Sequence, residues 1–90
     1  MSILLLTYDL NKEKNIQGDY QGFYNTRDSY PYVKLSESSY AIKTFETPAV
    51  IFNKLKPYVD KDDTIYIFPL AKPYSGYGLV STNNWLENNL

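Results

Sequence analysis

The chain of 90 residues contains neither cysteine nor histidine. Without cysteine it forms no disulfide and offers no thiolate to a metal ion, which suits a reducing compartment. Without histidine it lacks the commonest general base, the commonest metal ligand and every Ser-His or Cys-His nucleophile pair. Carboxylates, hydroxyls, lysines and the single arginine Arg27 are the groups that remain for chemistry.

Clustered positive charge and long apolar runs are also missing. The formal net charge is -1 and the pI is about 5.2, and the lysines are scattered. This composition does not favour nucleic acid as a partner, because such binding depends on grouped Lys and Arg. No stretch reaches the roughly 20 apolar residues that span a bilayer, and Met1 is not followed by the basic region of a signal peptide. We therefore expect a cytoplasmic protein with no membrane partner.

Tyrosine is the residue present in excess, with ten copies. One interpretation is that tyrosines serve as core aromatics in a small β-rich domain. The other is that they form a partner-binding or base-stacking surface, because tyrosine combines an apolar ring with a polar tip. The hydrophobic fraction of 43% predicts one small globular domain over residues 1–90, which a second subunit would help to stabilise.

Hydrophobic patterning predicts two helices and four strands. Strands are expected at 3–8, 32–35, 39–45 and 64–68, the last ended by Pro69. The first helix is predicted to start at the capping residue Asp19, run for about three turns and end before Pro31. The second starts at Thr47-Pro48, a capping hydroxyl followed by proline. It is expected to close near Pro57.

This order, β-α-β-β-α-β, predicts the ferredoxin-like α+β fold with both helices on one face of an antiparallel sheet. A short C-terminal extension follows, with a strand at Leu79-Val80 and then a helical turn or two capped by Ser81 or Thr82. A second subunit, a ligand or this extension is expected to cover the other face of the sheet.

Short motifs spread over most of the chain resemble one family. They are Tyr8-Asp9-Leu10-Asn11, the stretch 35–44 (LSESSYAIKT), the stretch 55–60 (LKPYVD), and Tyr74-Ser75-Gly76-Tyr77-Gly78 before Trp85-Leu86. The pattern is similar to that of small bacterial and phage proteins labelled "SinR family", which in turn resemble the CRISPR-associated Cas-two proteins and VapD-like proteins. The sequence departs from the family where Tyr77 replaces a tryptophan and where the first helix is shorter.

The resemblance gives Asp9 a specific role. It implies that an aspartate after the first strand binds a divalent metal, Mg²⁺ or Mn²⁺, together with its copy from a second subunit. It thereby implies a homodimeric, metal-dependent endonuclease for RNA or DNA with Asp9 as the catalytic residue, although some relatives are scaffolds without catalysis. From the residues alone, a turn is favoured, in which Asp9 caps the loop entry together with Asn11.

Other polar groups give weaker signals. Asp60, Asp62 and Asp63 lack the glycine and distal glutamate of a calcium loop and predict a solvated turn. The serines at 36, 38 and 39 have no histidine beside them, so we expect a polar bend and no nucleophile. Lys34 and Lys43 on the hairpin are two candidate phosphate contacts.

Four residues are candidates for binding a partner: Arg27, Tyr74, Tyr77 and Trp85. Arg27 suits an interface or phosphate anchor, or an ion pair with Asp28, Glu37 or another acid. The three aromatics either anchor the final segment on the sheet or form a binding surface.

Two functions follow for the whole chain. The first is a non-enzymatic interaction or adaptor module, phage-encoded or bacterial, that acts on a host protein or nucleoprotein complex and has no cofactor. The second is the Asp9 nuclease described above.

Overall fold

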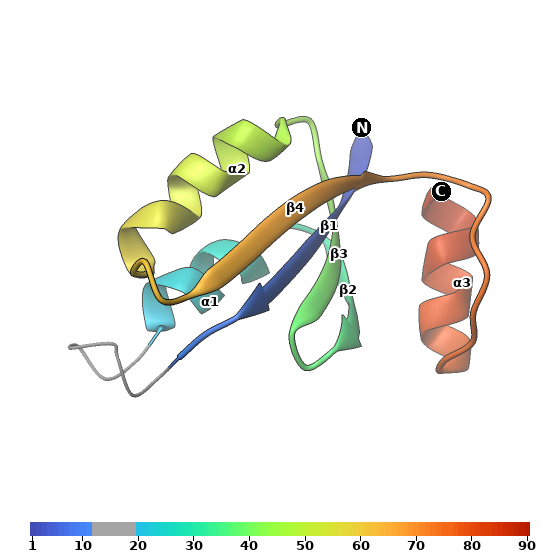
Figure 1. Cartoon of the computed structure of the whole chain (residues 1–90). Helices are drawn as coiled ribbons and strands as arrows, with labels where there is room; N and C mark the ends of the chain where they lie inside the picture. Colours follow the sequence, from blue (N-terminus) through green and yellow to red (C-terminus); the bar gives the residue numbers. More distant parts are fainter. Residues whose placement is uncertain (12–19) are drawn as a thin grey trace.

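The structure, a computed structural model, describes residues 1–11 and 20–90. Its elements in chain order are β1 (Ser2–Asp9), α1 (Gln21–Asp28), β2 (Tyr32–Ser36), β3 (Ser39–Thr44), α2 (Pro48–Leu55), the 3-10 turn η1 (Lys56–Tyr58), β4 (Thr64–Leu70) and α3 (Val80–Asn89). The strands form one sheet in the order β2-β3-β1-β4, and all neighbours are antiparallel. The predicted α+β class with a four-stranded antiparallel sheet is confirmed (Figure 1).

The main core lies between the sheet and the helices α1 and α2. It is built from alternate residues of the central strands and from the inner faces of both helices. Its buried members are Leu4, Leu6, Tyr8, Tyr20, Phe23, Tyr40, Ile42, Ile51 and Leu55. Burial of each large side chain contributes on the order of 1.5–3 kcal/mol, so this cluster carries most of the folding free energy that apolar burial supplies.

The tyrosines divide between buried and exposed positions. Tyr8, Tyr20 and Tyr40 are buried, and Tyr8 meets Phe23 edge to face with ring centroids 4.9 Å apart. Tyr66 and Tyr77, by contrast, are 60% and 100% exposed. Tyrosine therefore serves both as a core aromatic and as a surface residue in this chain.

Helix α3 lies on the other side of the sheet from α1 and α2 (Figure 1). Ile3 and Lys43 face each other in the β1–β3 register and point away from the main core, because their neighbours Leu4 and Ile42 point into it. The Lys43 ammonium donates to Asn89 Oδ1 on α3 at 3.0 Å. No helix in residues 1–11 and 20–90 is long and apolar enough to cross a membrane.

The predicted start of α2 is confirmed. The Thr47 side chain accepts a hydrogen bond from the Val50 N–H, and Pro48 occupies the first helical turn. Proline suits this position because its missing N–H would have no partner there. Pro57 lies in η1, which closes the helix as predicted.

Three predicted boundaries are wrong. The last strand does not end before Pro69; β4 continues to Leu70, because an edge strand tolerates proline where its nitrogen faces solvent. Leu79-Val80 is not a strand, since Val80 begins α3, a helix of ten residues that neither Ser81 nor Thr82 caps. Helix α1 has eight residues, about two turns and not three, and its predicted cap Asp19 lies outside the described residues.

Candidate functional site

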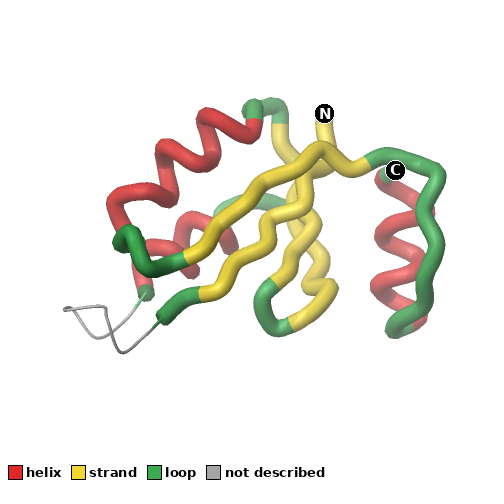
Figure 2. Tube along the Cα trace, viewed as in Figure 1, coloured by secondary structure: helices red, strands yellow, loops and turns green. Residues whose placement is uncertain are grey.

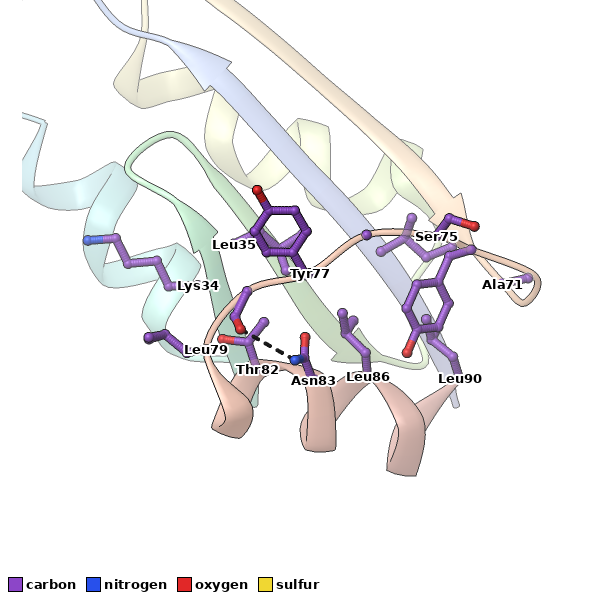
Figure 3. A pocket seen from close by; sticks show the side chains of 14 residues that line it. Lys34, Leu35, Ala71, Ser75, Tyr77, Leu79, Thr82, Asn83, Leu86 and Leu90 are labelled. Carbon is purple, nitrogen blue, oxygen red and sulfur yellow. Dashed lines mark hydrogen bonds between the residues drawn. The ribbon is translucent and has the colours of Figure 1, made fainter.

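A groove lies between α3, the segment 71–79 and the edge of β2, and we name it the α3 groove. Its volume is about 710 Å³. Apolar and small polar side chains line it, and Lys34 is the one charged residue among its described lining residues. The lining comprises Lys34, Leu35, Leu70, Ala71, Tyr74, Ser75, Gly76, Tyr77, Gly78, Leu79, Thr82, Asn83, Leu86 and Leu90. Figure 3 shows Leu86 and Leu90 projecting from α3 toward the strands, with Leu35 facing them across the hollow.

The segment 71–79 has no regular secondary structure and runs alongside α3 (Figure 2). Gly76 has φ of 156°, at the border of the positive-φ region that favours glycine, and nothing lies within 4 Å of the Cβ position it lacks. The Asn83 side chain donates to the Gly78 carbonyl at 3.4 Å. This contact joins the end of the segment to the first turn of α3.

Glu87 on α3 binds the beginning of this segment, near Lys72 and Tyr74. It accepts hydrogen bonds from the Tyr74 hydroxyl at 2.8 Å and from the Lys72 ammonium at 3.3 Å. The Tyr74 hydrogen bond and then the Lys72 contacts lower the pKa of Glu87. The same hydrogen bond raises the pKa of Tyr74. These exposed contacts orient the groove wall, although each contributes little to stability in water.

Exposed apolar side chains lie in and beside the groove. Tyr77 is 100% exposed, and Leu79 and Val80 are each 74% exposed. The expectation that Tyr77 anchors the final segment on the sheet is therefore wrong, because its ring touches solvent on all sides. An apolar rim beside an apolar hollow is typical of a surface that buries another chain.

The structure does not bring the four predicted partner-binding residues together. Tyr74 and Tyr77 line the α3 groove. Trp85 is half-buried on α3 but outside the groove lining. Arg27 lies on α1, on the opposite side of the sheet (Figure 1).

Arg27 is a structural residue within an aromatic cluster. Its guanidinium lies 4.1 Å from the Tyr40 ring centroid and 4.9 Å from that of Tyr24. Its Nη1 donates to the Tyr8 hydroxyl at 2.8 Å, and Nε and Nη2 donate to the Asp28 carboxylate. Its side chain is only 12% exposed. Of the expected roles, the ion pair with Asp28 is present, and little of the guanidinium is left for a partner.

The electrostatics of this cluster agree with that role. Burial opposes the charge on Arg27, but hydrogen bonds to Asp28 and Tyr8 outweigh it and raise the pKa of the guanidinium. Burial raises the pKa of the Tyr8 phenol, and the neighbouring Arg27 partly offsets this. Both groups therefore keep their proton at neutral pH.

Asp9 is exposed at the end of β1 and faces Thr64 of β4. Within the described ranges 1–11 and 20–90, no three Asp or Glu side chains gather closely enough to hold a metal ion. The sequence resemblance implies that a metal at Asp9 takes its second carboxylate from another chain.

The carboxylate that organises this end of the sheet is Asp63, which sequence reasoning treated only as part of a solvated turn. Its Oδ1 accepts from the Asn11 N–H at 2.7 Å and from the Tyr20 hydroxyl at 2.9 Å. Its Oδ2 accepts from the Asp60 N–H at 3.0 Å. Asp63 thus ties β1, α1 and β4 together, a role that only the long-range contacts reveal.

The hairpin lysines also have protein partners. Lys34 pairs with Glu37 at 3.2 Å, and Lys43 bonds Asn89 on α3. They do not form the grouped positive face that phosphate binding needs.

No family model matches this chain, and no solved structure matches it significantly.

Proposed function

We propose that this chain is a small non-enzymatic interaction module that binds a segment of another protein in the α3 groove. The observation that supports this proposal is the apolar hollow of about 710 Å³ beside Tyr77, Leu79 and Val80. Grooves of this size and lining take apolar side chains of a partner, with aromatic rings at the rim as anchors. The partner is a host protein, free or part of a nucleoprotein complex.

The chemistry of the groove selects an apolar occupant. Lys34 is the one charge among the described residues that line it, and its ammonium already pairs with Glu37. A charged segment would lose hydration there and gain no partner, whereas leucine-like side chains would meet Leu35, Leu86 and Leu90. We therefore expect an apolar helix or strand, with polar groups only at its ends.

We further propose that the fold is ferredoxin-like. The element order β1-α1-β2-β3-α2-β4 and the strand order β2-β3-β1-β4 support this, because a split β-α-β arrangement with both helices on one face has this connectivity. In that fold α3 is an addition, and its placement on the open face creates the groove.

The test is site-specific photo-crosslinking in cells of the source organism. A photoreactive phenylalanine replaces Tyr77 at the groove rim, and the matched control replaces Tyr58, which is 44% exposed on η1. We expect one discrete crosslinked protein from position 77 that is absent from position 58. Leu86→Asp, combined with the position-77 label, should abolish that product while the chain stays folded by circular dichroism.

A crosslinked protein found equally at both positions, or unaffected by Leu86→Asp, would contradict binding in the groove. The identified partner, once purified, should bind the wild-type chain in solution and bind Leu86→Asp at least about tenfold more weakly, the effect of one well-buried contact of roughly 1.4 kcal/mol.

The second candidate function is the metal-dependent nuclease that the sequence resemblance implies. Its supporting observation is that Asp9 is exposed at the end of β1. This reading needs a dimer in which two Asp9 carboxylates reach one ion. The geometry of self-association therefore separates the two candidates.

A further inference from the structure

The two edges of the sheet differ in how they are protected. β2, at one edge, carries Lys34, has a register shift between Lys34 and Ser36 against β3, and contacts α3. Charge, irregular pairing and a covering element are the devices that stop an edge strand from pairing with another chain. β2 is therefore an edge strand that is protected from pairing with another chain.

β4, at the other edge, lacks most of these devices. Its seven residues, TIYIFPL, include no charged side chain, and its register with β1 is regular from end to end. Tyr66 and Phe68 are 60% and 49% exposed on the face that looks away from the main core. Their rings stack with centroids 6.1 Å apart and planes at 23°. A long, uncharged edge with exposed aromatics is a surface suited to strand pairing.

The backbone groups that β4 offers outward can be assigned. The Tyr8 N–H donates to the Ser38 carbonyl at 3.0 Å, so the even-numbered residues of β1 bond toward β3 and the odd-numbered ones toward β4. Thr7 pairs with Tyr66 and Leu5 with Phe68, so these β4 residues bond to β1. By alternation, the N–H and C=O groups of Ile65 and Ile67 face away from the sheet.

Pro69 agrees with this assignment. It falls at an outward position of β4, where its missing N–H removes nothing from the bonds to β1. It also limits how far a partner strand can pair, because no N–H is available at that position. The free edge is thus confined to the part of β4 before Pro69.

We propose that a second copy of this chain docks on this edge, β4 against β4 and antiparallel, about a two-fold axis at Tyr66. In that register Ile65 exchanges hydrogen bonds with Ile67 of the partner subunit, and Ile67 with the partner's Ile65. Tyr66 lies directly opposite the partner's Tyr66. A register centred on Ile67 would instead place Ile65 opposite the partner's Pro69, which cannot donate.

The absence of charged side chains on β4 favours this edge over β2 for self-association. In a two-fold pairing every side chain at the axis meets its own copy, so a charged strand repels itself. β2 would bring Lys34 near the partner's Lys34, whereas β4 brings together only uncharged residues. The paired tyrosines add aromatic contact, a favourable cross-strand interaction.

This arrangement has a consequence for Asp9. Asp9 faces Thr64, which in the proposed register faces the partner's Phe68. From strand spacing and rise, the Asp9 residues of the two subunits would lie roughly 20 Å apart. One metal ion cannot bridge that distance, so this dimer would not form the shared site that the nuclease reading needs.

Sedimentation velocity on the full chain tests the proposal, because Tyr66 is exposed and its replacement leaves the core intact. We expect the wild type to dimerise. Tyr66→Lys and Tyr66→Glu should each raise the dissociation constant of the dimer about tenfold or more, because like charges face each other across the axis. Mixing the two variants should restore dimers, because lysine then faces glutamate. Tyr77→Lys is the matched control and should dimerise as the wild type does.

Three results would overturn the proposal. They are a wild type that stays monomeric at every concentration, a dimer that neither variant weakens, and variants that dissociate but do not recombine when mixed. Circular dichroism confirms that each variant is folded. The inference deepens the proposed function but is tested apart from it, since the α3 groove lies beside β2 and crosslinking at Tyr77 reports on the groove alone.

Discussion

Arg27 Nη1 on α1 donates a hydrogen bond of 2.8 Å to the Tyr8 hydroxyl on β1, and the same guanidinium covers the Tyr40 ring of β3. One side chain thereby joins a helix to the two central strands of the sheet. The only arginine of the chain thus holds the scaffold together, on the side of the sheet opposite to the α3 groove.

Replacing Arg27 should therefore cost stability. Arg27→Ala is expected to lower the free energy of unfolding by about 2–4 kcal/mol, because a charge-assisted hydrogen bond and cation–π contacts are lost. Arg27→Lys should recover only part of this, since lysine lacks the planar fork. Urea unfolding followed by circular dichroism measures the change. Lys34→Ala, which breaks an exposed pair, is the control and should change stability by less than about 1 kcal/mol.

Asp63 should be the most sensitive acidic residue at the loop end of the sheet. Asp63→Ala removes three hydrogen bonds, to Asn11, Tyr20 and the Asp60 N–H, and is expected to cost about 1–3 kcal/mol. Equilibrium unfolding measures this loss. Glu37→Ala serves as the comparison, because its side chain is 94% exposed. An equal effect from both replacements would contradict the organising role of Asp63.

Acid should weaken the protein partly through Glu46. Hydrogen bonds from Lys54 and Tyr30 lower the pKa of this carboxyl from 4.5. A lowered pKa stabilises the fold above the ordinary value of 4.5 and loses that contribution as pH falls through the folded-state value. The stability difference between wild type and Glu46→Gln should thus be present at pH 7 and shrink below pH 4.5. Unfolding curves at several pH values measure it, and a difference that grows on acidification would contradict the prediction.

Helix α3 should unfold before the sheet. None of the α3 residues is buried, and none belongs to the main core or packs against it. Trp85, the single tryptophan, lies on α3 and reports on it by fluorescence. In urea, the fluorescence transition should precede the circular dichroism transition. Coincident transitions would show that α3 is part of the main cooperative unit.

Local signals in the sequence were enough to predict the strands of the sheet and the start of α2. Alternating apolar residues predicted the strands, and Thr47-Pro48 predicted the start of α2, because caps depend on neighbours a few residues away. Pro69 was misjudged for the opposite reason. Whether a proline ends a strand depends on which neighbour lies on each side, and only the sheet order shows that β4 is an edge.

The candidate site was less predictable. Tyr74 and Tyr77 were grouped together because both lie in a short glycine-containing segment, and both line the α3 groove. The groove itself depends on where α3 packs, and the roles of Arg27 and Asp63 come from partners 19 and 43 residues away. Composition gave no sign of these contacts, since they are set by the tertiary fold.

The most direct test of a non-enzymatic module is a cleavage assay on labelled single- and double-stranded DNA and RNA, with Mg²⁺, Mn²⁺ or EDTA. The wild type is compared with Asp9→Ala. We predict no metal-dependent cleavage, or a trace activity that is equal in both proteins and so comes from a contaminant. Cleavage that requires the metal and disappears in Asp9→Ala would make Asp9 a catalytic ligand and contradict the interaction module.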